Sequence, residues 1–304
     1  MKKTLTLLAV ILTAMTFCGS CSSTRHTGAG SDNAADGKNA AATRVDAVAC
    51  DSLTVISFNI RNGKAKDGDN DWNHRCPATK AMLETLRPDI FGVQEAYDYQ
   101  VTYITENCPD YASFGVGRDD GVSQGEHMSI FYNKQVMEMI QGGTYWLSET
   151  PDVPSYGWDA VCRRTATWAL LRDLRNGREF FFVNTHLDHK GWEARRRGLA
   201  LIVEKIAAMN PDNKPMILTG DFNVTPDNDC LAELNTMMSS AREKATVSDT
   251  RVSYQGFGKS EGSIIDYIYY SGFSTCTLFR VVTETYADIP YISDHYPVEA
   301  IIRW

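Results

Sequence analysis

The sequence predicts an α/β (α+β) protein in which two packed mixed β-sheets are flanked by helices. Short apolar or alternating runs, which are typical of strands, recur from residue 53 to residue 302. Helical patterns separate some of these runs, and the turn Asn176-Gly177 separates two others. There is no internal repeat at solenoid spacing. Mixed hairpin and helical connections favour two sheets with helices outside them.

The composition indicates one large folded domain over residues 51–304. The chain has 304 residues, of which 43% are hydrophobic and 11% aromatic, which is enough for a large core in one α/β domain. The formal net charge is -8, so no global basic field would recruit nucleic acid. A local basic groove remains compatible with this charge.

Residues 1–20 have the pattern of a signal peptide. Lys2 and Lys3 precede the apolar run Leu5 to Phe17, which is too short to span a bilayer comfortably. Small residues before Cys21 resemble a bacterial lipoprotein cleavage box, with Cys21 as the lipidated residue, whereas bulky Phe17 precedes Cys18. The alternative is an ordinary secretory signal. Both predict an extracytoplasmic protein, and the first predicts a lipid anchor in the cell envelope, on its periplasmic or surface side.

Residues 21–50 are expected to be a flexible tether. Ser22 to Ala49 is rich in small and polar residues, so it buries too little apolar surface to offset the entropy lost on ordering. Six cysteines lie beyond the signal region, with no zinc-ligand spacing. They could be free thiols or form disulfides, which an extracytoplasmic location permits.

In the first half of the domain, strands and helices alternate. Met82, Leu83 and Leu86 form the apolar face of the first predicted helix. We expect strands at Leu53–Ile60, Ile90–Val93, Tyr111–Val116, Met128–Tyr132, Gln135–Gly143 and Tyr145–Leu147, and helices at Ala78–Leu86 and Glu95–Asn107.

The second half begins with a hairpin at Asn176-Gly177 and continues with a long helix whose apolar positions recur at helical spacing. We expect strands at Arg164–Leu171, Phe180–Asn184, Met216–Leu218, Ile264–Tyr270, Thr277–Val282 and Val298–Ile302, and helices at Trp192–Met209 and near Asn228–Met238.

The stretch Met216-Ile217-Leu218-Thr219-Gly220-Asp221-Phe222-Asn223 carries the first chemical signal. A buried strand ends at Gly220, which permits close backbone approach. Asp221 and Asn223 then point to one side if the chain is extended. Their oxygens suit a hard cation or an attacking water, although a polar turn would use the same residues.

The same arrangement recurs along the chain, since polar side chains stand at or beside the ends of apolar runs. Ends of strands are where α/β proteins gather sites. Asp266 lies inside an apolar run, where a carboxylate needs a cationic or N–H partner, and a histidine would serve. The other such residues are Asn59, Glu95, Glu126, His186, Asp294 and His295.

Six ordered motifs resemble the endonuclease/exonuclease/phosphatase superfamily. They are Ser57-Phe58-Asn59-Ile60-Arg61, Gln94-Glu95, Asn184-Thr185-His186-Leu187-Asp188, Gly220-Asp221-Phe222-Asn223, Ile265-Asp266-Tyr267-Ile268 and Ser293-Asp294-His295. The resemblance covers Leu53 to Trp304 and implies a DNase I-like four-layer sandwich. It implies a Mg²⁺-dependent phosphoesterase, with Mn²⁺ as a possible substitute.

The resemblance also implies roles for the metal site and the first histidine. Glu95 is implied as the principal Mg²⁺ ligand, with Asn59 beside it and Asp294 completing the site. Asp221 and Asn223 would orient the attacking water and the phosphate. His295 would act on the nucleophile or stabilise the pentavalent phosphate, with Asp266 fixing its tautomer.

His186 is implied as a second catalytic histidine. Glu126 falls where DNase I-type and sphingomyelinase-type members keep the acid that pairs with it, so the pair argues against the AP-endonuclease branch. The basic residues nearest these motifs predict contacts with an anionic substrate group. They are Arg61, Arg164, Lys190 and Arg195.

The sequence does not choose one substrate. Tyr156, Trp158 and Trp192 could form an aromatic wall for a base, sugar or lipid, or could be core residues. We expect a hydrolase of phosphate esters, acting on small molecules, nucleic-acid fragments or lipid head groups. The alternatives are a non-specific nuclease, a sphingomyelinase-like enzyme and an inactive binding module of the same fold. No obligate protein partner is evident, and the lipid anchor would supply the membrane contact.

Overall fold

The computed structural model describes residues 51–304. The predicted signal peptide (1–20), the lipidation of Cys21 and the tether (21–50) lie outside these described residues. Within residues 51–304, no helix combines the length and the apolar character needed to cross a membrane.

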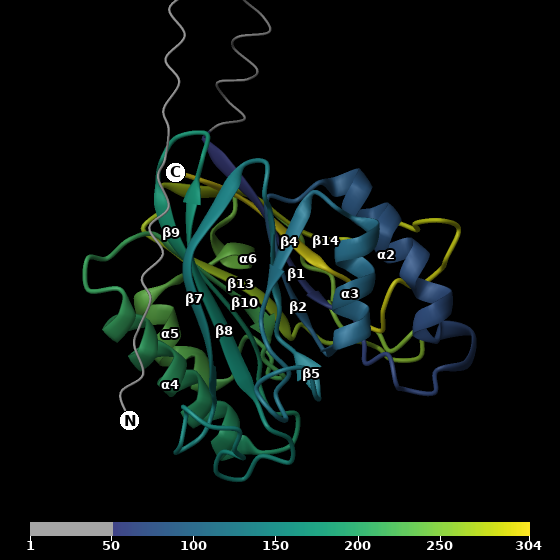
Figure 1. Cartoon of the computed structure of the whole chain (residues 1–304), viewed down its shortest axis with the longest axis horizontal. Coiled ribbons are helices and arrows are strands. Elements are labelled where there is room, and N and C mark those ends of the chain that lie inside the picture. The colour runs from purple at the N-terminus through teal and green to yellow at the C-terminus, as the bar shows by residue number, and fades with distance from the viewer. Residues whose placement is uncertain (1–50) are drawn as a thin grey trace, which may run out of the picture. The chain divides into compact units, whose positions relative to one another are not determined.

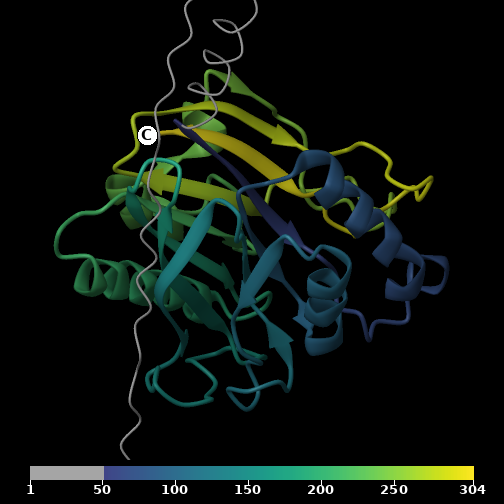
Figure 2. The same ribbon diagram turned by 45° about the horizontal axis from the view of Figure 1, so that its top comes forward.

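The first sheet has seven strands, and β1 (Ser52–Asn59) lies at its centre. It pairs in parallel with β2 (Ile90–Gln94) and antiparallel with β15 (Val298–Arg303), which the purple and yellow strands of Figure 2 show side by side. The sheet order is β12-β14-β15-β1-β2-β6-β4. The remaining strands are β4 (Tyr111–Phe114), β6 (Ile130–Asn133), β12 (Val247–Ser248) and β14 (Thr275–Val281).

The second sheet has six strands in the order β11-β13-β10-β9-β8-β7. Only β9 and β10 run in parallel there, and the other neighbours are antiparallel. Its strands are β7 (Met137–Trp146), β8 (Thr165–Asp173), β9 (Glu179–His186), β10 (Met216–Asp221), β11 (Ser239–Ser240) and β13 (Asp266–Ser271). A separate two-stranded ribbon joins β3 (Ala96–Tyr97) to β5 (Glu126–His127).

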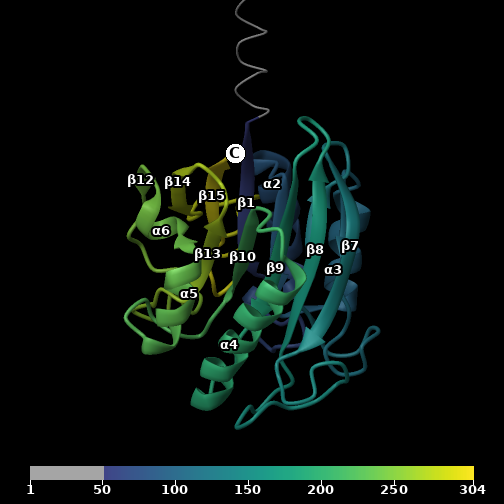
Figure 3. The same ribbon diagram turned by 90° about the vertical axis from the view of Figure 1, so that its left-hand side faces the viewer.

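Helices cover the outer faces of both sheets. In Figures 1 and 3, α4 (Trp192–Met209) and α5 (Ala232–Met237) lie against the six-stranded sheet, and α2 (Trp72–Leu86) and α3 (Asp98–Asn107) lie on the far side of the other sheet. The short elements are α6 (Ala241–Lys244) and two 3-10 turns, η1 (Gly68–Asn70) and η2 (Asp229–Leu231).

Three apolar clusters hold these four layers together. Val55, Phe182 and Ile217 belong to the cluster between the sheets. A second cluster joins the six-stranded sheet to α4, and a third joins the seven-stranded sheet to α2 and α3. Burying each large side chain contributes roughly 1.5–3 kcal/mol. The predicted two-sheet fold with outer helices is confirmed.

The boundaries differ from the prediction at informative places. Helix α2 begins at Trp72 and continues through Pro77. Because Pro77 has no backbone N–H to donate to the carbonyl of Asn73, the sulfhydryl of Cys76 donates to that carbonyl instead. Glu95 is not helical: it has a φ of 63°, and α3 starts at Asp98. Strand β1 alternates apolar and polar residues in sequence, as a half-buried strand would, but is buried on both faces from Val55 onward because it is central in a covered sheet.

Candidate active site

Three site residues form one row across the six-stranded sheet. Asp221 ends β10, and its register partners are His186 on β9 and Asp266 on β13. Gly220 lets β10 approach its neighbour, because a Cβ there would lie 2.4 Å from the carbonyl oxygen of Thr185. Pairing between adjacent strands therefore brings together side chains that are far apart in sequence.

The seven-stranded sheet contributes the other side of the site. Asn59 ends β1 opposite Gln94, the last residue of β2. Glu95 follows with a φ of 63°, which is uncommon for a residue with a side chain. The hydroxyl of Ser293 donates to the carbonyl of Asn59 at 2.7 Å, and this bond holds the loop that carries Asp294 against β1.

These strand ends border a cleft of about 850 Å³. Asn59 and Asp266 lie behind its wall, and Lys190 does not line it, so Lys190 is not placed to bind substrate there. The predicted residues that line the cleft are Arg61, Glu95, Glu126, Arg164, His186, Arg195, Asp221, Asn223, Asp294 and His295.

Asn59 links two carboxylates. Its amide nitrogen donates to Glu95 Oε1 and to Asp221 Oδ2, both at 3.0 Å. Its oxygen accepts from the backbone N–H of Arg61 at 3.0 Å. In this orientation Asn59 positions the two carboxylates, and its role as a metal ligand stays a prediction that requires the amide to turn.

The acidic end of the cleft suits a divalent cation. One ligand atom each of Glu95, His186 and Asp221 lies within 4.8 Å of the others, and Asp294 lines the same cleft. Carboxylate oxygens are the ligands that Mg²⁺ prefers. Burial and the charge of Asp266 raise the pKa of Asp221 to about 7, and burial also raises the pKa of Asp294. A cation would offset the cost of ionising these crowded acids.

Glu95 is the carboxylate most favourably held in its charged form. Burial opposes its ionisation, but the charge of His295 and the hydrogen bonds from Asn59 and the Asn62 backbone outweigh burial and lower its pKa. The residues present therefore fit the magnesium site predicted around Glu95.

His295 is the partner that the sequence predicted for the carboxylate of Asp266. His295 Nδ1 lies 2.8 Å from Asp266 Oδ2, and His295 Nε2 lies 3.7 Å from Asp221 Oδ2. Burial lowers the pKa of His295, but the charge and hydrogen bond of Asp266 outweigh burial and raise it to about 10. His295 is therefore a buried imidazolium at neutral pH.

His186 is in the opposite protonation state. Burial lowers its pKa well below the ordinary value, and the charges of Arg164 and Arg118 act in the same direction. Its Nε2 lies 3.0 Å from the amide nitrogen of Asn223, a donor, so the ring is neutral with its proton on Nδ1.

The predicted pair of Glu126 with His186 is not formed. His186 Nδ1 is buried and has no hydrogen-bond partner among the described residues. Glu126 Oε2 instead lies 2.5 Å from Arg118 Nη1, and Glu126 Oε1 accepts from Asn62 at 3.1 Å. Arg118, which sequence reasoning missed, competes for the carboxylate because a guanidinium is always charged.

Two of the predicted basic residues are anchored around Asp188. Arg164 Nε lies 3.4 Å from Asp188 Oδ2, and Arg164 Nη2 lies 2.9 Å from His189 Nδ1. Arg195 Nη1 donates to the backbone carbonyl of Asp188 at 2.9 Å. Arg61, in contrast, pairs closely with Asp67 and lies 3.3 Å from Asp294.

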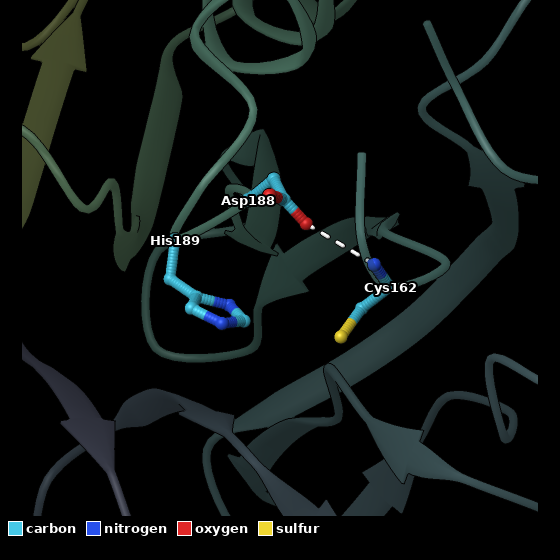
Figure 4. A group of neighbouring side chains, drawn as sticks. All are labelled: Cys162, Asp188 and His189. Atoms are coloured by element: carbon cyan, nitrogen blue, oxygen red, sulfur yellow. Dashed lines mark hydrogen bonds between the residues drawn. The ribbon is translucent and has the colours of Figure 1, made fainter. Parts of the chain in front are cut away.

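Cys162, Asp188 and His189 form a cluster beside the cleft, which Figure 4 shows with the bond from the Cys162 backbone to Asp188. Its ligand atoms are close enough for a metal ion. However, each Asp188 oxygen already accepts backbone N–H groups, and the guanidinium of Arg164 bonds His189. A neighbouring positive charge disfavours a cation, so this cluster serves to position Arg164.

The aromatic prediction is not supported by the cleft. Tyr156 and Trp192 are exposed, at 53% and 56%, and neither they nor Trp158 line it. Tyr254, which sequence reasoning missed, does line it and packs edge-on against His295 with ring centres 5.0 Å apart. Its isolated bridge to His295 depends on long-range folding, so no local pattern announced it.

The cysteines give no support for disulfides. All five cysteines in the described part of the chain are free thiols, and they are Cys76, Cys108, Cys162, Cys230 and Cys276.

Comparisons with known proteins agree with this geometry. The model of the Endonuclease/Exonuclease/phosphatase family matches residues 56–295. A Bacteroides thetaiotaomicron mannosyl-6-phosphatase is 36% identical, with a TM-score of 0.79 and coverage of 83% of this chain and 100% of that one. A Bacteroides vulgatus endonuclease/exonuclease/phosphatase is 34% identical, with a TM-score of 0.79 and coverage of 83% and 98%.

A curated relative, the uncharacterized protein L388 of Acanthamoeba polyphaga mimivirus, is 27% identical over 83% of this chain and its own full length. The family match includes strands of both sheets and every strand end that borders the cleft. The chain therefore belongs to the endonuclease/exonuclease/phosphatase family, whose members are hydrolases of phosphate esters.

Proposed function

We propose that this protein is a Mg²⁺-dependent hydrolase of phosphate monoesters of small polar molecules, acting outside the cytoplasm. The observation that carries the proposal is the convergence of Glu95, Asp221, Asp294 and two histidines on one cleft from both sheets. The similarity to a mannosyl-6-phosphatase favours a sugar-like phosphate ester over other esters. The extracytoplasmic location rests on the signal pattern of residues 1–20 and on the predicted lipidation of Cys21.

The chain's own residues supply positioning, proton transfer and charge stabilisation. A bound divalent cation would neutralise charge on the phosphate oxygens and lower the pKa of water. Asp221, which lines the cleft beside His186 and Asn223, accepts the proton of the attacking water. The water oxygen bonds to phosphorus as the bond to the alcohol oxygen breaks in line, and the departing alcohol oxygen takes up a proton from bulk water.

The two histidines act differently because their charges differ. The imidazolium of His295 donates from Nε2 to an oxygen of the phosphoryl group, where negative charge must be stabilised. Asp266 holds that ring in one tautomer through its bond to Nδ1. Asn223 fixes neutral His186 through Nε2 and leaves the Nδ1 proton available to a substrate oxygen.

A panel of substrates tests the proposal. Glucose 6-phosphate is expected to release phosphate in the presence of Mg²⁺ much faster than bis(4-nitrophenyl) phosphate, sphingomyelin or plasmid DNA is cleaved. Rapid plasmid nicking with slow phosphate release would establish the nuclease alternative instead. Unchanged activity in Glu95→Ala and His295→Ala would contradict the assigned site. Absence of any hydrolysis would favour the inactive binding module.

A further inference from the structure

Part of the cleft wall is basic and is distinct from the acidic end. We call Arg164, His189 and Arg195 the basic stretch. All three line the cleft, whereas the carboxylate of Asp188 lies behind them with a fully buried side chain. The carboxylate of Asp188 therefore does not stand between the basic stretch and a ligand in the cleft.

The cleft lining contains buried N–H groups that have no partner. Arg164 Nη1, Arg195 Nε and His186 Nδ1 are buried atoms without a hydrogen bond among the described residues. The side chain of Arg164 is only 4% exposed, and that of His186 only 5%. A buried donor left unsatisfied costs roughly 1–3 kcal/mol, and more when it is charged. These donors, together with Arg118 Nε on the same cleft, indicate a ligand that accepts hydrogen bonds.

The basic stretch carries more positive charge than the single carboxylate behind it can neutralise. Arg164 and Arg195 are both charged, but one carboxylate, Asp188, lies between them. Arg195 bonds the backbone carbonyl of Asp188 and forms no ion pair with any residue of 51–304. The other arginines of the cleft differ, because Arg118 pairs with Glu126 and Arg61 pairs with Asp67. One of the two guanidinium groups therefore has no ion-pair partner in the described part of the chain, and a neutral hydroxyl group would leave its charge unbalanced.

His186 lies where the acidic end and the basic stretch meet. Its Nε2 lies 3.5 Å from Asp221 Oδ2, on the side of the proposed metal site. Its Nδ1, on the other edge of the ring, carries the unpartnered N–H. The two nitrogens of the His186 ring therefore face different surroundings, with Asp221 on the side of Nε2 and no partner among the described residues at Nδ1.

We propose that the basic stretch binds a second anionic group of the substrate, a phosphate or a carboxylate, in addition to the phosphate that is cleaved. This inference rests on the proposed function and specifies its substrate class. The cleft, at about 850 Å³, has room for both groups. The charge on the second group would balance the unpaired guanidinium and accept the free N–H bonds.

The experiment compares pairs of monoesters that differ by one anionic group. Glucose 6-phosphate is paired with glucose 1,6-bisphosphate, and glycerol 3-phosphate with 3-phosphoglycerate, so that two spacings and both types of anion are tested. Each is assayed with the full-length wild type and with Arg195→Gln. The matched control is Arg196→Gln, because Arg196 is exposed on the same helix and pairs with Glu193.

In at least one pair, the doubly anionic member is expected to have a kcat/KM about ten- to a hundred-fold higher. Arg195→Gln should lower the kcat/KM of the doubly anionic member about tenfold more than that of the singly anionic member, while Arg196→Gln changes neither. An equal loss on both members would overturn the inference, since Arg195 would then serve the cleaved phosphate or a hydroxyl group. No preference in either pair would also overturn it.

A binding measurement separates this inference from the proposed function. In EDTA, calorimetry with glucose 1,6-bisphosphate and 3-phosphoglycerate is expected to show tighter binding than with their partners, and to lose the difference in Arg195→Gln. If no substrate is hydrolysed but this difference is present, the proposed function fails and the second anion site stands. If substrates are hydrolysed but the difference is absent, the inference fails alone.

Discussion

His295 Nδ1 and Asp266 Oδ2 lie 2.8 Å apart, although the two residues are 29 positions apart in the sequence. The pair is buried at the point where a loop before β15 meets the first residue of β13. Asp266 keeps His295 protonated and oriented, because burial alone would lower the pKa of the imidazole. The proposed chemistry therefore depends on a residue that does not line the cleft.

Replacing Asp266 with asparagine is expected to lower kcat by about 10²- to 10⁴-fold, the range seen when an acid–base group loses its function. The imidazolium would lose its negative partner, so the alkaline limb of the kcat profile should move to lower pH. Steady-state kinetics across pH measures both effects. Circular dichroism of the variant is the folding control, and an unchanged pH profile would show that Asp266 has no effect on the charge of His295.

His295 also makes stability depend on pH. Its folded pKa, about 10, lies above the ordinary value of 6.5, so its contribution is fully present below pH 6.5 and is lost as the pH rises toward 10. In EDTA, the difference in unfolding free energy between wild type and His295→Gln should shrink over this range, by at most about 1.4 kcal/mol per pH unit. Urea denaturation at pH 6.5, 8 and 10 measures it. A difference that grows with pH would reverse the assigned sign.

Arg75 is expected to position two site segments. It is fully buried, and its guanidinium donates to the carbonyls of Ile60 and Ile292 at 2.9 and 2.7 Å. These carbonyls stand next to the segments that carry Asn59 and Asp294.

Arg75→Met should lower the unfolding free energy by about 3 kcal/mol, since it leaves these carbonyls without their donor. In the fraction that stays folded, kcat should fall more than KM rises. Denaturation and kinetics measure the two effects. Arg75→Lys, which keeps the charge and one donor, should recover part of the loss, and equal behaviour of both variants would argue against the positioning role.

The thiols should differ in reactivity. Burial raises the pKa of Cys108 and Cys276 to about 11, so very little thiolate is present at pH 8. Cys162 lines the cleft and is partly exposed. Iodoacetamide labelling of the native protein, read by peptide mass spectrometry, should modify Cys162 before the two buried cysteines. If Cys162 is labelled in the native protein no faster than Cys108 and Cys276, and all three are labelled fully only in urea, then Cys162 is also protected.

Local patterns predicted most strands, the long helix α4 and the polar residues at strand ends. Helix α4 was predicted with its observed bounds, because its apolar positions repeat over 18 residues. The bend at Glu95 was not predicted, since its positive φ is set by the surrounding structure. The first helix was predicted to begin at Ala78, whereas α2 begins at Trp72 and contains Pro77.

The candidate site also contains some residues that the sequence predicted and others that it did not. The position of Asp266 in an apolar run predicted a cationic or N–H partner, for which a histidine would serve, and His295 is that partner. Arg118 and Tyr254 could not be found, because their approach to Glu126 and His295 arises from contacts between distant segments. Lys190 was chosen because it follows His186 closely in the sequence, but its exposed side chain does not line the cleft.

The most direct test is the dependence of phosphate release on the metal. Wild-type protein treated with EDTA should lose hydrolysis of glucose 6-phosphate and regain it with Mg²⁺. Glu95→Gln should keep its fold but lose at least about a hundred-fold in kcat/KM at the same Mg²⁺ concentration. Hydrolysis that is unchanged by EDTA, or full activity in Glu95→Gln, would contradict a cation held at this cleft.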